Sequence, residues 1–112
     1  MLRDLEPSIT ATTDFVPIGA LRRSLDGLAN EFGFKIEEDT DDLGPVRCAY
    51  LETDDGNRFL LRRYSSYPDQ IVDLFIPAQL PDHELAVEDI IDELNVRRDE
   101  MIPGEGDYRR LR

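Results

Sequence analysis

The sequence predicts an α+β fold in which a four-stranded antiparallel sheet (a meander) is flanked by an N-terminal and a C-terminal helix, in the order αββββα. A hairpin signal lies at residues 46–64, and helical patterns of apolar residues precede and follow it. The single α+β domain is predicted over residues 17–102. Residues 1–16 are expected to be an N-terminal arm, and residues 103–112 a flexible C-terminal tail.

The hairpin signal is centred on Asp54-Asp55-Gly56, because glycine accepts the positive φ of a tight turn without steric cost. Two registers compete. A two-residue loop pairs Leu51 with Leu60 but sets apolar residues against charged ones. A three-residue loop pairs Glu52 with Arg58 and sets apolar against apolar behind them. We expect the three-residue loop, because it gives one apolar inner face and a cross-strand ion pair on the other face.

Further strands are predicted on either side of the hairpin. Residues 34–37 alternate and predict a short first strand, whereas residues 38–45 are acidic and predict a loop. Residues 71–76 predict the last strand, with Arg62 facing Asp73. The predicted inner face then consists of Ala49, Leu51, Phe59, Leu61, Val72, Leu74 and Ile76.

Apolar residues at intervals of three and four predict both helices. The first spans residues 17–32 and stops at Gly33. The second spans residues 83–94, with Asp82 as its N-cap and Asn95 ending it in the left-handed conformation. The stripe of the first helix is Ile18, Leu21, Leu25, Leu28 and Phe32. With both helices on the inner face of the sheet, we expect the outer face to be uncovered.

The composition excludes some partners. The chain has 112 residues and a net charge of −12, which disfavours nucleic acid phosphates and anionic membranes and favours a basic protein partner. Lys35 is the only lysine beside twelve arginines. Two interpretations of this acidic, arginine-rich composition stay open. It reflects either an adaptation to high salt or a GC-rich coding sequence that favours arginine codons.

Residues that carry chemistry are few. Cys48 cannot form an intramolecular disulfide, and without an apolar segment long enough for a signal peptide or membrane span we expect a cytoplasmic protein. One cysteine and His83 cannot make a structural zinc site, so we expect no metal, no cofactor and a surface histidine. The acidic residues before Gly44 fail as a calcium loop, because Tyr50 occupies the position of the bidentate glutamate.

The outer face of the predicted sheet is the candidate interaction surface, since aromatic residues with a charged rim are typical of protein interfaces. A second copy forming a homodimer, a different protein, or the N-terminal arm with Leu2, Leu5 and Ile9 would cover it. The basic segment 108–112 is either a short docking peptide or a disordered terminus. The candidate surface consists of Tyr50, Leu60, Tyr64, Ile71 and Phe75, together with Arg62.

These features favour a small, non-catalytic protein–protein interaction module, of the kind found among small acidic chaperones, inhibitors, antitoxins and immunity-type proteins. The alternative is a small-ligand-binding domain or small enzyme with a pocket between helices and sheet. A purely structural domain of a larger assembly is a third possibility.

Overall fold

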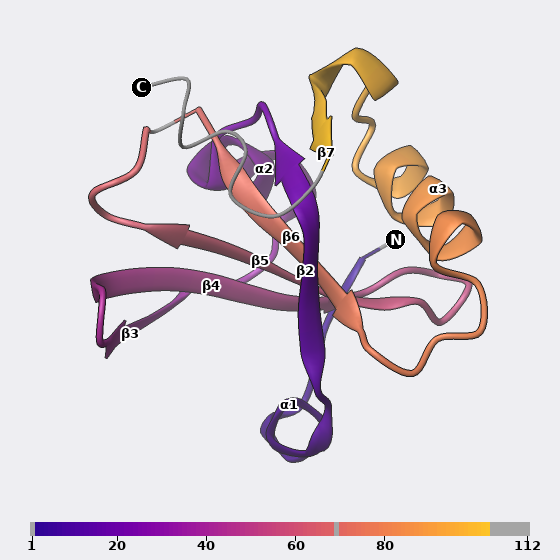
Figure 1. Cartoon of the computed structure of the whole chain (residues 1–112), viewed down its shortest axis with the longest axis horizontal. Helices are drawn as coiled ribbons and strands as arrows, with labels where there is room; N and C mark the ends of the chain where they lie inside the picture. The colour runs from indigo at the N-terminus through magenta and orange to yellow at the C-terminus, as the bar shows by residue number, and fades with distance from the viewer. Residues whose placement is uncertain (1, 69, 104–112) are drawn as a thin grey trace.

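The computed structural model describes residues 2–68 and 70–103 (Figure 1). These residues form one antiparallel sheet of seven strands with three α-helices, so the predicted four-stranded αββββα arrangement is wrong. The elements are β1 (Arg3–Asp4), α1 (Pro7–Thr12), β2 (Phe15–Leu21), α2 (Leu25–Phe32), β3 (Glu37–Asp41), β4 (Gly44–Glu52), β5 (Arg58–Tyr64), β6 (Val72–Pro77), α3 (His83–Glu93), a 3-10 turn (Arg98–Glu100) and β7 (Met101–Pro103).

The stripe predicted as one N-terminal helix belongs to two elements. Ile18 and Leu21 lie on β2, and only the later residues of the stripe lie on α2. Residues 15–18 are mostly aromatic or β-branched, which suits a strand, and residues 15–17 pair with β6. The side chain of Ser24 accepts a hydrogen bond from the Gly27 amide at 3.2 Å and so begins α2 much later than predicted.

The segment predicted as an acidic loop forms a second hairpin. β3 pairs with β4 through a two-residue turn at Asp42-Leu43, and Gly44 follows the turn with a φ of 112°. Of the strand predicted at residues 34–37, only Glu37 belongs to β3, and residues 34–36 precede it. Charged residues are compatible with a strand here because β3 lies at an edge of the sheet and packs no side chain into a core.

The central meander was predicted with the correct register. Glu52 pairs with Arg58 and Arg62 pairs with Asp73, as expected for the three-residue loop. The inner face is buried beneath α2 and α3, with every predicted strand residue at most 1% exposed. The second helix is also confirmed: the Asp82 side chain accepts from the Leu85 amide at 3.1 Å, and Asn95 has a φ of 55°.

The outer strands come from segments distant in the sequence. The strand order is β1-β4-β5-β6-β2-β7, and β3 also pairs with β4. The predicted N-terminal arm therefore contains β1, α1 and the start of β2, and its predicted boundary at residue 16 falls inside β2. Pro103 ends β7, and the rest of the predicted tail, residues 104–112, lies outside the described residues.

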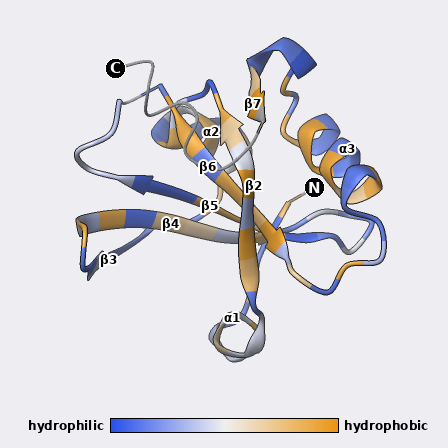
Figure 2. Ribbon diagram, in the orientation of Figure 1, coloured by the Kyte–Doolittle hydropathy of each residue, from blue (hydrophilic) through white to orange (hydrophobic). Residues whose placement is uncertain are grey.

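The face of the sheet opposite α2 and α3, here called the second face, is covered by the curl of the sheet itself. The rings of Phe15 on β2 and Tyr50 on β4 lie 5.8 Å apart, although β5 and β6 separate these strands in the sheet. Figure 1 shows β2 crossing the direction of β4 and β5 steeply. Apolar residues consequently run along both faces of the central strands, whereas β3 is hydrophilic (Figure 2).

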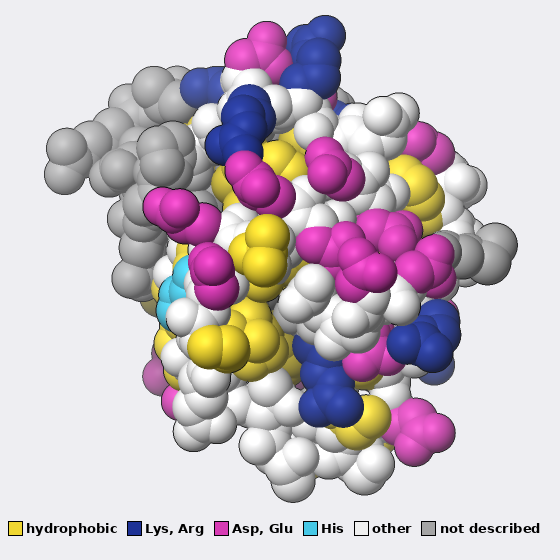
Figure 3. Space-filling model, turned by 90° about the vertical axis from the view of Figure 1, so that its right-hand side faces the viewer, with side chains coloured by type: hydrophobic (Ala, Val, Ile, Leu, Met, Phe, Trp, Pro, Cys, Tyr) yellow, Lys and Arg dark blue, Asp and Glu magenta, His cyan; other side chains and the backbone are white. Residues whose placement is uncertain are grey.

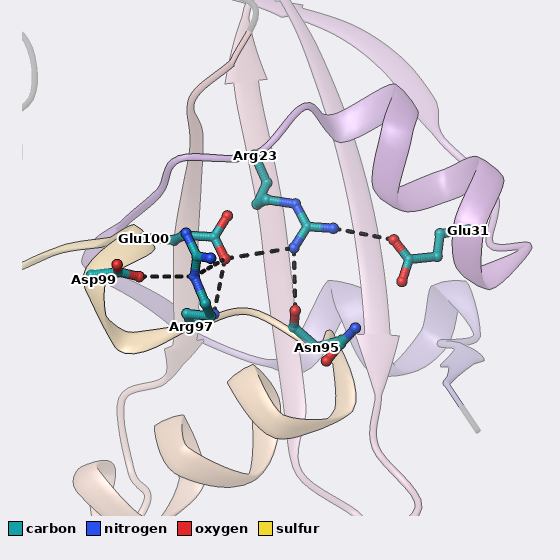
Figure 4. Close-up of polar contacts among 6 residues, drawn as sticks. All are labelled: Arg23, Glu31, Asn95, Arg97, Asp99 and Glu100. Carbon is teal, nitrogen blue, oxygen red and sulfur yellow. Dashed lines mark hydrogen bonds and ion pairs between the residues drawn. The ribbon is translucent and has the colours of Figure 1, made fainter.

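Arg23 fixes the C-terminal part of the fold to the start of α2 (Figure 4). Its guanidinium donates to Glu31 Oε1 at 3.1 Å and to the Asn95 carbonyl at 3.3 Å, and it lies 3.9 Å from Glu100 Oε1. Glu100 also accepts from the Arg97 amide at 2.9 Å. These contacts hold the 3-10 turn where β7 can add to β2.

Candidate functional site

β3 is the longest strand of the described sheet in which every residue is exposed. All five of its residues are exposed, four of them are acidic, and among the described residues it pairs only with β4. An edge strand presents backbone groups that another chain can pair with, and acidic side chains restrict which chain can do so. We therefore take β3 and its surroundings as the candidate functional site.

Along β3, backbone groups that bond to β4 alternate with backbone groups that point outward. Because the β3–β4 turn has only two residues, the flanking pair Asp41 and Gly44 is hydrogen-bonded. The amides and carbonyls of Glu37, Asp39 and Asp41 therefore point toward β4, and those of Glu38 and Thr40 point away from the sheet. The Thr40 amide donates to Asp39 Oδ1 at 2.8 Å. Glu38 therefore offers both an outward amide and an outward carbonyl.

A hollow of about 230 Å³ lies between α1 and β3 on the second face. One side is acidic, β4 forms the floor, and the opposite side comes from α1 and the segment that links β1 to α1. We call this the α1–β3 hollow. Its lining residues are Leu5, Pro7, Thr10, Glu37, Glu38, Asp39, Cys48 and Tyr50.

A second hollow, of about 280 Å³, borders the other face of β3 and is lined in part by Glu38, Thr40 and Arg47. Arg47 donates to Asp26 Oδ2 at 2.9 Å and lies 3.6 Å from Glu38 Oε1. The hydrogen bond from Arg47 lowers the pKa of the Asp26 carboxyl. A cation already occupies this side of β3, so the negative charge of β3 is partly neutralised there.

The electrostatics of the α1–β3 hollow are negative. Burial, against the opposing charge of Arg62 and with smaller contributions from Asp39, Glu37 and Asp41, raises the pKa of the Cys48 thiol to about 11. Burial also raises the pKa of Tyr50, with contributions from Cys48, Glu37 and Asp39. Cys48 is therefore a buried, protonated thiol at neutral pH and not an activated nucleophile. The negative charges of Glu37 and Asp39 therefore act on Cys48 and Tyr50 at the floor of the hollow.

The far end of β3 is attached to the second face. The Tyr64 hydroxyl donates to Asp41 Oδ2, which lowers the pKa of Asp41. Burial and this hydrogen bond raise the pKa of Tyr64 to about 12. The guanidinium of Arg62 lies 4.3 Å from the centre of the Phe75 ring and 5.0 Å from that of Tyr64. The hydrogen bond from Tyr64 therefore holds the Asp41 end of β3 against the second face.

The predicted interaction surface lies on the second face but is not uncovered as expected. Leu60, Tyr64, Phe75 and Ile71 are at most 8% exposed, because the curled sheet covers them. Ile71 packs in a separate small cluster with Ala20. The other two residues, Tyr50 and Arg62, are half-buried. Whether any of the six contacts a partner stays a prediction. Tyr50 is the member that reaches the α1–β3 hollow.

The other predicted candidates lie away from β3. His83 is exposed at the first turn of α3. Over residues 2–68 and 70–103, no three His, Cys, Asp or Glu side chains gather closely enough to hold a metal ion. None of the helices in this part of the chain has the length and apolar character needed to cross a membrane. β3 was not predicted from the sequence as a candidate site. The sequence feature that could have indicated it is the short acidic run of residues 37–42, which ends in a turn before a predicted strand.

Comparisons of the chain with protein-family models, with curated proteins and with solved structures found no match.

Proposed function

We propose that this protein is a non-catalytic, cytoplasmic protein-binding module that pairs an extended, basic segment of a partner with the free edge of β3. The observation that carries the proposal is an edge strand whose five residues are all exposed and whose Glu38 directs its backbone amide and carbonyl outward. Addition of a strand to a sheet edge obtains affinity from backbone hydrogen bonds and specificity from alternate side chains.

Charge supports the basic character of the partner. Four of the five β3 side chains are acidic, and the whole chain carries a net charge of −12. An acidic surface accelerates association with basic partners and repels acidic ones. The simplest opposing interpretation is that these side chains only protect the edge from aggregation. The two interpretations differ in what happens when a basic strand is supplied.

Substitutions at Glu38 can distinguish binding by backbone pairing from binding by charge attraction alone. We propose titration of an extended peptide that alternates lysine and threonine, followed by amide chemical shifts of the protein. Glu38→Gln and Glu38→Pro both remove the charge, but only Glu38→Pro removes the outward amide. Proline at this position removes no bond to β4, so the fold should survive.

The expected result is that peptide-induced shifts centre on β3, that Glu38→Gln binds somewhat more weakly, and that Glu38→Pro binds much more weakly still. Equal binding by the two variants would contradict backbone pairing, and shifts away from β3 would contradict the site. A matched peptide that alternates glutamate and threonine should not bind. Its binding would contradict the role of charge.

A second candidate function is small-ligand binding in a hollow of about 470 Å³ between α3 and the β2–β7 edge. Its size falls within the range of small-molecule pockets. Ile18, Val87 and Met101 line it, and hydrophobic side chains are visible among acidic ones on this side of the molecule (Figure 3). Val87→Trp should fill this hollow without affecting β3. A fluorescent hydrophobic dye that binds the wild type and not this variant would favour the ligand-binding function.

A further inference from the structure

The α1–β3 hollow is sized for one side chain. Its volume of about 230 Å³ is below the range of about 300–1,000 Å³ that is typical of small-molecule sites. It also lies directly beside the edge at which a partner strand would add. A residue on that strand would be its nearest occupant.

The two sides of the hollow differ in chemistry. Glu37 and Asp39 alternate along β3, so their side chains share the second face and form the acidic wall. Leu5 and Pro7 form the apolar wall, and Tyr50 contributes an aromatic ring to the floor. Arginine and lysine have this dual character, with an apolar stem and a charged head, and both pack their stems on apolar surface.

The distance from an added strand to the floor of the hollow also requires a long side chain. A strand added to β3 would lie about 4.8 Å beyond it, and the floor of the hollow is one strand further in. A side chain from the added strand must therefore cross β3 to enter the hollow. Short basic or polar side chains would end above Glu37 and Asp39.

We propose that the α1–β3 hollow receives the side chain of an arginine or lysine from the partner. The charged head lies between the carboxylates of Glu37 and Asp39, and the stem packs on Leu5 and Tyr50. The proposal rests on the proposed function, because the partner strand along β3 delivers the side chain. It adds a specificity determinant: one basic residue of the partner matters more than its neighbours.

The test compares two peptides of the alternating design described above, one with arginine at the central position and one with citrulline, its neutral counterpart of similar shape. Wild-type protein should bind the arginine peptide about tenfold or more tightly, because a charge-assisted hydrogen bond is lost with citrulline. The methyl signals of Leu5 should shift with the arginine peptide and much less with the citrulline peptide.

Two variants examine the hollow itself. Thr10→Trp fills it from α1, whereas Thr12→Trp places the same ring on the same helix outside its lining. Thr10→Trp should bind both peptides equally, and Thr12→Trp should retain the preference for arginine. Should Thr10→Trp fail to fold, Glu37→Gln should reduce the preference, with Glu84→Gln on α3 as the control of equal charge.

Each negative outcome has a separate meaning. Equal binding of both peptides by wild-type protein, with binding still lost in Glu38→Pro, would overturn the hollow and leave strand addition standing. Retention of the preference in both Thr10→Trp and Glu37→Gln would likewise overturn the hollow. Failure of both peptides to bind wild-type protein would overturn strand addition, and the hollow with it.

Discussion

The hydroxyl of Thr53 donates a hydrogen bond of 2.6 Å to Oδ2 of Asp89, which joins the tip of the β4–β5 hairpin to α3. The same carboxylate oxygen accepts from the Asn57 side chain at 2.6 Å, and the Thr53 oxygen accepts from the Asn57 amide at 3.1 Å. Thr53 is fully buried although it is polar. Its bonds are therefore protected from water and should matter for stability.

Thr53→Val keeps the shape of the side chain and removes both hydrogen bonds. The expected loss in the free energy of unfolding is about 1–3 kcal/mol, because Asp89 and the Asn57 amide each lose a partner. Urea denaturation measures it. Thr40→Val on the exposed β3 is the control and should stay within about 0.5 kcal/mol of wild type. If Thr53→Val lowered the free energy of unfolding no more than Thr40→Val does, the hydrogen bond between Thr53 and Asp89 would not be a stabilising contact.

The carboxyls of Asp55 and Asp89 share one site at this hairpin tip. The hydrogen bond to Asp89 and the charge of that carboxylate raise the pKa of Asp55. Burial opposes ionisation of Asp89, but hydrogen bonds from Thr53, Asn57 and Asp55 together lower its pKa. A raised pKa in the folded state means that Asp55 favours folding below its unfolded pKa, and that this contribution is lost as the pH rises through the folded pKa.

Asp55→Asn imitates the protonated form and should stabilise the protein at pH 7. The gain should disappear as the pH falls below the ordinary carboxyl range near about 4, where wild-type Asp55 is itself protonated. Urea midpoints at neutral and acidic pH measure the difference. A lower urea midpoint for Asp55→Asn than for wild type at neutral pH would contradict the raised pKa of Asp55 beside Asp89.

Leu60→Arg places a charge in the middle of the second face. Leu60 is 5% exposed in the single chain, so we expect a loss of about 3–5 kcal/mol in a protein that is monomeric before and after the change. Thermal unfolding and light scattering measure the two properties. Conversion of a wild-type dimer into a stable, folded monomer would instead mean that the second face is a homodimer interface.

Two glycines should respond to alanine in opposite directions. Gly56 has a φ of 89° in the hairpin turn, so Gly56→Ala should cost about 1–2 kcal/mol. Gly27 lies in the first turn of α2, where an added methyl group would meet Ser24 at an ordinary contact distance of 3.5 Å. Gly27→Ala should therefore stabilise by about 0.5–1 kcal/mol. If both substitutions changed the free energy of unfolding in the same direction, the backbone conformations assigned to the two glycines would be wrong.

The acidic composition can be tested by salt. Repulsion among exposed charges is already screened beyond about 10 Å at 0.1 M salt. An unfolding temperature that continues to rise with potassium chloride into the molar range would favour salt adaptation. A flat response above that concentration would favour the codon-usage interpretation of the arginine excess.

Elements defined by neighbouring residues could be predicted from the sequence. The register around Gly56 and the caps of α3 depend on residues a few positions apart, and both were correct. β2 was not, because Ile18 and Leu21 fall by coincidence at helical intervals before Leu25. The strand character of β2 comes from pairing with β6, which no local pattern records.

The site was missed for a related reason. Glu37–Asp41 carries no apolar face, so its periodicity favours a loop, and only the presence of β4 beside it makes it a strand. The covering of Leu60 and Phe75 depends on how far the sheet curls, and curvature has no signature in residue spacing. The prediction of a basic protein partner, by contrast, rests on charge, and no structural detail alters that basis.

The position of β2 between β6 and β7 has a consequence for biosynthesis. β1 and β2 leave the ribosome before β4 and β6, the strands with which they pair, have been synthesised. Until then Val16, Ile18 and Leu21 have no sheet to join, and pairing over such separations is slow. The β4–β5–β6 meander should therefore form first on the nascent chain. The N-terminal segment would dock onto it only after Pro77 has emerged.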